Sequence, residues 1–118
     1  MKMDNKETFE NIKKQIQEFN RVRNWDKYHR PKDLILALME ELGELSRIFK
    51  WVNARNELKY LKKDEVKEEI ADIFIYLFIL CYKADIDISD AIMEKLRIND
   101  RKYPLGKKFR KGGYKNEE

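Results

Sequence analysis

The sequence predicts an all-α fold, a four-helix antiparallel bundle-type domain that assembles as an oligomer. Charged residues make up 41% of the 118-residue chain and hydrophobic residues 42%, with only four Gly and two Pro, a balance that favours helices over a sheet. Apolar residues also recur at alternating spacings of three and four, the period of an amphipathic helix. A chain of this length holds one modest core, so we expect a single domain over residues 1–104.

The first two predicted helices flank an aromatic connector at residues 25–30. The first helix runs from about residue 5 to 24, and its apolar stripe consists of Phe9, Ile12, Ile16 and Phe19. Pro31 suits the first turn of the second helix, which ends near residue 50. The apolar stripe of this helix consists of Leu34, Leu38, Leu42, Leu45 and Phe49.

The second half of the chain predicts two further helices. A polar connection over residues 52–63, with one short turn near 58–61, leads to a third helix from about 64 to 83, for which Asp64 is the expected N-cap. Ser89 is expected to cap a fourth helix, which ends near Tyr103, before Pro104.

Charge and composition exclude several classes of protein. The net charge of +4 is concentrated in residues 101–118, which carry +5, while residues 1–100 carry −1. We therefore expect a basic, flexible tail over residues 105–118 and no nucleic-acid binding by the folded body. Contact of this tail with the phosphates of a ligand is the alternative to a solvated tail. The apolar run at 70–82 is too short to span a membrane, and no signal peptide is expected. The single Cys81 cannot form an internal disulfide and suits a reducing cytoplasm.

Two acidic pairs carry the functional information: Glu41 with Glu44, and Glu69 with Asp72. Each pair is spaced i, i+3 and therefore shares one helical face, within apolar sequence where an unpaired carboxylate is costly to bury. If the second and third helices form an antiparallel hairpin, the two pairs lie at nearly the same distance from the connection at 52–63 and can face each other. Ordinary solvated acidic faces are the alternative. We favour a cation site because the surroundings of Asp72 are so apolar.

The ligand types indicate which cation would bind. All four candidates are hard oxygen donors, and no Cys or His has a suitable spacing, so Mg²⁺ or Mn²⁺ fits and Zn²⁺ does not. A di-iron bundle would need Glu-x-x-His pairs, and the only histidine, His29, lies in a connector. Since Mg²⁺ held by carboxylates usually keeps positions open for substrate phosphates, phosphate chemistry is the natural inference.

Two strings carry a family resemblance: Leu36-Ala-Leu-Met-Glu-Glu-Leu-Gly-Glu-Leu45 and Glu68-Glu-Ile-Ala-Asp-Ile-Phe-Ile-Tyr-Leu77. They resemble the MazG-like all-α nucleoside triphosphate pyrophosphohydrolases, whose signature is Glu-Glu-x-x-Glu followed about one helix later by Glu-x-x-Asp. Three further strings are similar to the dCTP pyrophosphatase branch: Arg23-Asn-Trp-Asp-Lys-Tyr-His-Arg-Pro31, Phe49-Lys-Trp51 and Lys95-Leu-Arg-Ile-Asn-Asp-Arg-Lys-Tyr-Pro104. The resemblance covers roughly residues 23 to 105.

The resemblance implies hydrolysis of a nucleoside triphosphate between its α and β phosphates. Nucleotide pool sanitation, control of dCTP or dUTP levels, and a phage or stress function are the alternative roles. It implies that Glu41, Glu44, Glu69 and Asp72 bind Mg²⁺, which helps to activate the attacking water. Glu41 is our candidate for the base that takes the proton of that water. Glu40 matches a motif position that this branch does not require, so we leave it outside the ligand set.

Seven further residues are candidates for substrate binding: Trp25, His29, Trp51, Tyr76, Lys95, Asn99 and Tyr103. By resemblance, the first three belong to the base and sugar pocket, although a Trp at a helix end is often a core anchor and a lone connector His is often structural. Tyr76 follows Asp72 by four residues and shares its face. The last three recur at i, i+4 and i+8 and suit phosphate or sugar contacts, unless they form only the polar edge of an amphipathic helix.

The predicted partners are the nucleotide substrate and further copies of the chain. Phe74, Phe78 and Tyr82 add a second apolar edge to the third helix, which four short helices can hardly enclose alone. Because members of the family are oligomers, we expect a homotetramer built from dimers. Two alternatives from other classes remain, a catalytically idle nucleotide-binding or protein-interaction module and a small basic nucleic-acid-binding protein.

Overall fold

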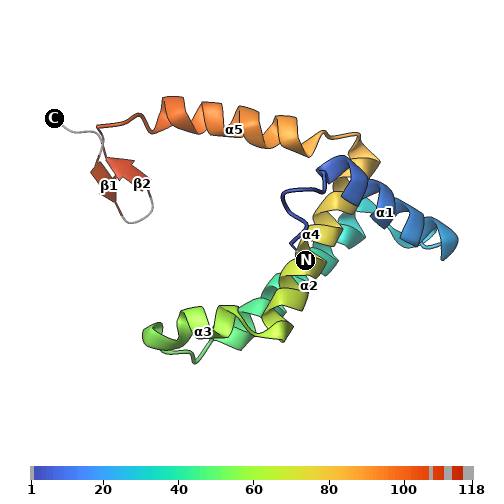
Figure 1. The fold of residues 1–118 in the computed structure, drawn as a ribbon, viewed down its shortest axis with the longest axis horizontal. Coiled ribbons are helices and arrows are strands. Elements are labelled where there is room, and N and C mark those ends of the chain that lie inside the picture. The colour runs from blue at the N-terminus through green and yellow to red at the C-terminus, as the bar shows by residue number, and fades with distance from the viewer. Residues whose placement is uncertain (1, 107, 111–112, 116–118) are drawn as a thin grey trace. The chain divides into compact units, whose positions relative to one another are not determined.

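The computed structural model of the protein describes residues 2–106, 108–110 and 113–115, with side chains up to residue 106 (Figure 1). The chain forms two compact units, Met1–Asp85 and Ile86–Glu118, and each unit is described by itself. The prediction of one domain over residues 1–104 therefore stays a prediction.

The first unit consists of helices joined by short turns. Its elements are α1 (Phe9–Val22), the 3₁₀ turn η1 (Asp26–Tyr28), α2 (Pro31–Phe49), the 3₁₀ turn η2 (Ala54–Asn56), α3 (Glu57–Leu61) and α4 (Asp64–Ala84). The predicted helices at 31–50 and 64–83 match α2 and α4 closely, and the predicted turn near 58–61 is α3.

Helix α1 begins later and ends earlier than the sequence predicts. The Thr8 side chain caps it by accepting a hydrogen bond of 3.1 Å from the backbone N–H of Asn11. Beyond its end, Asn24 adopts a positive φ of 55°, which turns the chain into η1. Phe9 packs against Phe78 of α4, with 5.5 Å between the ring centroids, and this contact helps to hold α1 on α4.

Helices α2 and α4 form the antiparallel hairpin that the acidic pairs require, and they lie side by side in opposite directions (Figure 1). Pro31 occupies the first turn of α2, as predicted. The prediction for the start of α4 is wrong by one residue: Lys63 is the N-cap, and Asp64 lies in the first turn, where its charge still favours the helix N-terminus. Asp85, in the left-handed conformation, ends α4 by donating its backbone N–H to the carbonyl of Cys81.

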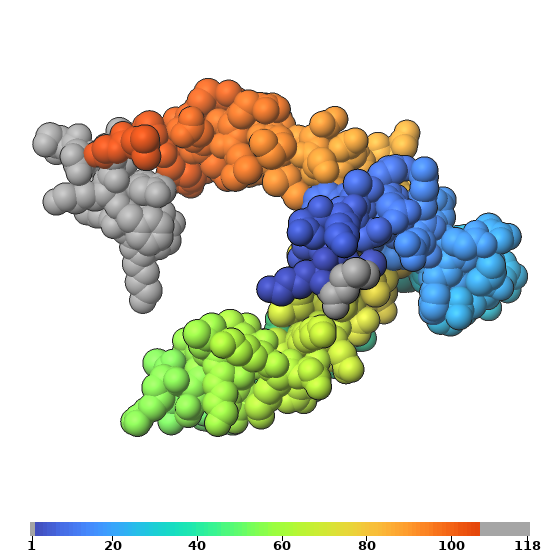
Figure 2. Space-filling model, viewed as in Figure 1, coloured from blue at the N-terminus to red at the C-terminus, as the bar shows by residue number. Residues whose placement is uncertain are grey.

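The core of the described residues is small. Its apolar members come from α2 and α4: Leu34, Val66, Phe78, Ile79 and Cys81. Figure 2 shows α1, in blue, covering one end of α4, whereas α3, in green, lies at the opposite end of the hairpin. Much of the apolar surface of α2 and α4 remains exposed, as at Leu36 and Phe74, each 52% exposed.

The second unit contains α5 (Ile88–Lys102) and a two-stranded antiparallel hairpin, β1 (Lys108–Arg110) paired with β2 (Gly113–Lys115). Asp87, not Ser89, caps α5, because its carboxylate accepts a hydrogen bond of 2.9 Å from the backbone N–H of Asp90. The strands were not predicted. The flexible tail over residues 105–118 stays a prediction, and residues 107, 111–112 and 116–118 lie outside the described ones.

The all-helical class holds for residues 2–106, while the four-helix bundle stays a prediction because α5 belongs to the second unit. No helix in the described part of the chain combines the length and apolar composition that a membrane crossing would need.

Candidate metal centre and nucleotide pocket

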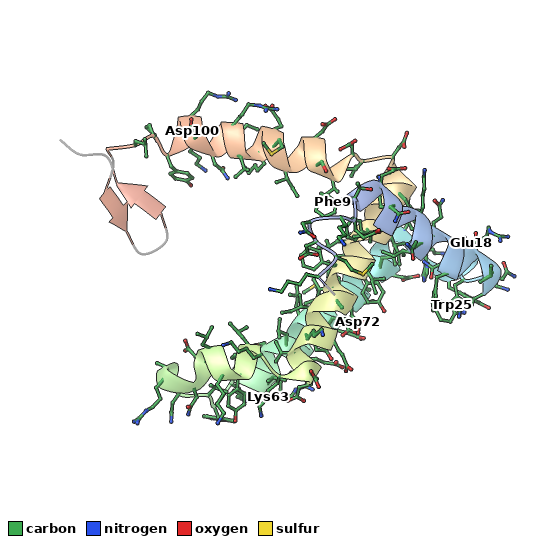
Figure 3. All side chains as sticks on the ribbon, viewed as in Figure 1. Phe9, Glu18, Trp25, Lys63, Asp72 and Asp100 are labelled. Carbon is green, nitrogen blue, oxygen red and sulfur yellow. The ribbon has the colours of Figure 1, made fainter. Side chains whose placement is uncertain are left out.

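Three of the four predicted ligands meet between α2 and α4. Glu41, Glu69 and Asp72 each offer a carboxylate oxygen, and these oxygens all lie within 4.8 Å of one another. Figure 3 labels Asp72 on α4, near the middle of the hairpin. Glu69 and Asp72 share one face because they are three residues apart, and the antiparallel pairing of the helices brings Glu41 opposite them.

Glu44 lies beside this group of three residues but is not part of it. A side-chain hydrogen bond with Glu69, together with the negative charge of that residue, raises the pKa of Glu44. The pKa of Glu69 is also raised, first by a hydrogen bond with Glu41 and then by loss of solvent. The acidic residues are therefore close enough to compete for protons when no cation is present.

The donor set fits a hard divalent cation. When the carboxyls are ionised, buried Oε2 of Glu69 has no hydrogen-bond partner in the described part of the protein. Oxygens bound to Mg²⁺ lie about 2.1 Å from the ion, so any two of them are at most about 4.2 Å apart. Among three donors of an octahedral ion at most one pair lies opposite, and neighbouring donors lie about 3.0 Å apart, so oxygens within 4.8 Å of one another need to close by up to about 1.8 Å, which side-chain rotations can supply.

A cavity of about 470 Å³ adjoins the acidic cluster, a size suited to a small ligand. It lies between α1, the connector after α1, and α4, and its lining includes Gln15, Phe19, Asn20, Trp25, His29, Asp72 and Tyr76. Asp72 links the two features, because it belongs both to the carboxylate group and to the cavity wall. Burial and then the charges of Glu41 and Asp72 raise the pKa of Tyr76, so its hydroxyl stays protonated beside the carboxylates.

Two of the predicted pocket residues come from the connector. Trp25 packs edge-on against Phe19 at 5.7 Å between ring centroids, yet it is still 43% exposed and lines the cavity. It is therefore both an anchor for the connector and a candidate stacking surface. His29 lines the same cavity, and its Nδ1 is buried without a partner among the described residues. Burial, followed by the charge of Lys83, lowers the pKa of His29 and keeps the ring neutral.

Of the other four candidates, Trp51 does not line this cavity, and the remaining three lie in the second unit. Trp51 lies just beyond the end of α2, 85% exposed, with the Lys50 ammonium 5.3 Å from the centre of its ring. Lys95 and Asn99 lie on α5, and Tyr103 follows that helix directly. All three belong to the second unit, so their predicted role at the site stays a prediction.

Sequence reasoning missed the polar residues that α1 contributes to the cavity, Gln15 and Asn20. Asn20 follows Ile12 and Ile16 at intervals of four residues, so it continues the apolar stripe of α1 with a polar side chain. That interruption was the available signal, because a polar residue on a buried face must find a partner.

Comparisons with known proteins agree with this geometry. The profile of the MazG-like family matches residues 37–114. Over about a hundred residues the chain is 34% identical to human dCTP pyrophosphatase 1 (82% of this chain, 59% of the relative) and 33% identical to the Bos taurus protein of the same name (83% and 60%). The chain thus spans about three fifths of the length of these relatives.

A solved structure is also similar. The crystal structure of a pyrophosphatase from Archaeoglobus fulgidus superposes with a TM-score of 0.75 and 42% sequence identity, covering 80% of this chain and 91% of that one. The family profile spans both acidic pairs, and this structure shares the fold that brings them together. The chain therefore belongs to the MazG-like family.

Proposed function

We propose that the protein is a Mg²⁺-dependent nucleoside triphosphate pyrophosphohydrolase that cleaves between the α and β phosphates and releases a monophosphate and pyrophosphate. The observation that carries this proposal is a carboxylate group beside a cavity of about 470 Å³, joined to it by Asp72. This arrangement suits a ligand with an anionic, cation-binding end and an aromatic end. The names of the relatives, dCTP pyrophosphatase and pyrophosphatase, support the same reaction.

Each residue of the site has a part in this reaction. Glu41, Glu44, Glu69 and Asp72 would hold the cation, and Mn²⁺ is a possible substitute for Mg²⁺ because both prefer oxygen ligands. When bound, the cation supplies positive charge that neutralises the phosphates and favours ionisation of a water molecule. Glu41, the proposed general base, accepts the proton of the attacking water.

The cavity would bind the base and the sugar. The exposed face of Trp25 offers stacking, and the neutral His29 and the protonated Tyr76 offer hydrogen bonds. Trp51 would add to the base and sugar pocket, and Lys95, Asn99 and Tyr103 would contact phosphates or sugar, as the family strings imply. The proposed substrate is dCTP or a related pyrimidine or modified nucleotide, and the proposed role is sanitation of the cytoplasmic nucleotide pool.

We also propose that the protein works as a homotetramer built from dimers. The apolar side chains exposed on α2 and α4, such as Met39 (64%) and Phe74 (52%), are more than a stable monomer usually leaves in water. Light scattering at micromolar concentration measures the mass directly. A tetrameric mass supports the assembly, and a monomeric mass contradicts it.

The reaction is tested with a panel of common dNTPs and NTPs plus dUTP, each with Mg²⁺ and with EDTA, with the products resolved by anion-exchange chromatography. Mg²⁺-dependent release of a monophosphate and pyrophosphate supports the proposal. Release of a diphosphate and phosphate contradicts the proposed cleavage position. Binding of a nucleotide without turnover favours the alternative function, an idle nucleotide-binding or protein-interaction module.

A further inference from the structure

Asn20 is a buried polar side chain in the wall of the nucleotide pocket. It is only 3% exposed, and it lies on α1 near the connector that carries Trp25 and His29. Its Nδ2 donates a hydrogen bond of 3.0 Å to the hydroxyl of Tyr82 on α4. The same hydroxyl donates to Oδ1 of Asp26 at 3.4 Å. The consecutive elements α1 and η1 are thus both joined to α4, which is distant in sequence, by one chain of hydrogen bonds.

This chain determines which end of the Asn20 amide faces Tyr82. A tyrosine hydroxyl has one proton, and an ionised carboxylate can only accept. Burial raises the pKa of Tyr82, so the hydroxyl keeps its proton and donates a hydrogen bond to Asp26. Tyr82 must then accept from its other neighbour, and the NH₂ end of Asn20 is the donor. The carbonyl Oδ1 of Asn20 is the end left for another partner.

No hydrogen bond within the described part of the protein engages Oδ1 of Asn20. Asn20 lines the cavity together with Asp72, so this hydrogen-bond acceptor and a predicted metal ligand belong to the same pocket. The buried Nδ1 of His29, also without a partner, lines that cavity as well. A pocket that holds an acceptor not engaged by the protein and a buried nitrogen without a partner is expected where a polar ligand completes the hydrogen bonding.

We propose that Asn20 is a specificity-determining residue, whose carbonyl accepts a hydrogen bond from the exocyclic amino group of a nucleobase such as cytosine. The proposal rests on the nucleotide pocket of the proposed function. Tyr82 and Asp26 are positioning residues, because they act through the orientation of the Asn20 amide. A base without an amino group leaves the Asn20 carbonyl unpaired when the pocket closes around it, which weakens its binding.

The test compares dCTP with the 2′-deoxynucleoside triphosphate of pyrimidin-2-one, in which hydrogen replaces the 4-amino group and N3 remains an acceptor. Turnover is measured as kcat/KM. Binding is measured separately by calorimetry with α,β-imido analogues of both nucleotides in the presence of Mg²⁺. For the unaltered protein, we expect a preference for the amino-bearing base of roughly 5- to 100-fold in both measurements, the range for one buried acceptor left unpaired.

Two variants and a control identify the source of the preference. Asn20→Leu removes the carbonyl while keeping the volume, and we expect the preference to fall to about twofold or less. Tyr82→Phe keeps Asn20 but frees its amide to rotate, so we expect a partial loss of preference even if the first variant fails to fold. Gln17→Leu, on the exposed side of α1 and away from this cavity, should keep the full preference.

The outcomes separate this inference from the proposed function. An unchanged preference in Asn20→Leu or in Tyr82→Phe overturns the role of Asn20, even if the enzyme releases pyrophosphate normally. Equal binding of the two analogues by the unaltered protein also overturns it. An amino-group preference in binding that Tyr82→Phe reduces supports the role of Asn20, even if no nucleotide is turned over and the proposed reaction is wrong.

Discussion

Replacing Glu69 by Gln should have opposite effects on the protein with and without Mg²⁺. Glu69 lies within 4.8 Å of both Glu41 and Asp72, and contacts with other carboxyls raise its pKa. In the metal-free protein at neutral pH, the ionised cluster opposes folding, because the folded state holds like charges together. Removing one of these charges should therefore raise the melting temperature in EDTA. In Mg²⁺, the same change removes one of three close donor atoms, so the rise in melting temperature that Mg²⁺ causes should be smaller.

The expected size of this decrease follows from how much the loss of one ligand weakens Mg²⁺ binding. Loss of a residue that merely orients a metal ligand typically weakens binding 10- to 100-fold, so loss of a direct ligand should weaken it at least about tenfold. When Mg²⁺ is well above its dissociation constant, a tenfold loss lowers the stabilisation by about 1.4 kcal/mol. For a domain of this size, we expect the Mg²⁺-induced rise in melting temperature to be smaller by roughly 5–10 °C.

The measurement is thermal unfolding of the two proteins in EDTA and across a Mg²⁺ titration, with Glu68→Gln as the matched control. Glu68 is the neighbouring residue on α4, is exposed, and loses the same charge, but it is not part of the carboxylate group. If Glu69→Gln and Glu68→Gln respond equally to Mg²⁺, the cation does not bind at the cluster and our interpretation is wrong.

Three further predictions concern the reaction, the core and the pocket. Asp72→Ala, or Glu44→Ala, should abolish pyrophosphate release while the far-UV circular dichroism stays unchanged; near-normal activity in either variant would remove that residue from the metal site. Leu34→Ala should lower the free energy of unfolding by about 2–5 kcal/mol in urea titrations, because Leu34 is 2% exposed; a change below 1 kcal/mol would place it outside the core. His29 should titrate below its ordinary pKa of 6.5, so stability should rise with pH between the lowered value and about 6.5, since the unfolded chain binds the proton more readily. Because His29 is the only histidine, its NMR signal reports this pKa directly, and a value at or above 6.5 would contradict its burial in the cavity.

The helices could be predicted because their signals are local. Apolar spacing and Pro31 located α2 to within about a residue, and the same periodicity located α4. The N-caps were less predictable. Asp64 and Ser89 are acceptable capping residues, but Lys63 and Asp87 have the backbone conformation of a cap, and that conformation depends on how the preceding turn approaches the helix. The strands β1 and β2 were missed because three-residue strands carry no periodicity to detect.

The acidic cluster was predictable for a similar reason. A spacing of three residues places two carboxylates on one face of a helix, and an antiparallel hairpin brings the two pairs to nearly the same distance from its connection. The four donors, the hard cation that they suit and the family signature are thus properties of the sequence by itself.

Only the tertiary structure decided which side chains surround the cavity beside the cluster. Asn20 and Asp26 lie close in sequence, on α1 and η1, but Tyr82 on α4 is distant from both, and no helical spacing relates it to them. Their hydrogen bonds arise when α1 packs on α4 and buries Asn20 between them. Helical spacing acts over one or two turns and can be read from the sequence, whereas contacts between distant segments depend on the packing of the folded chain.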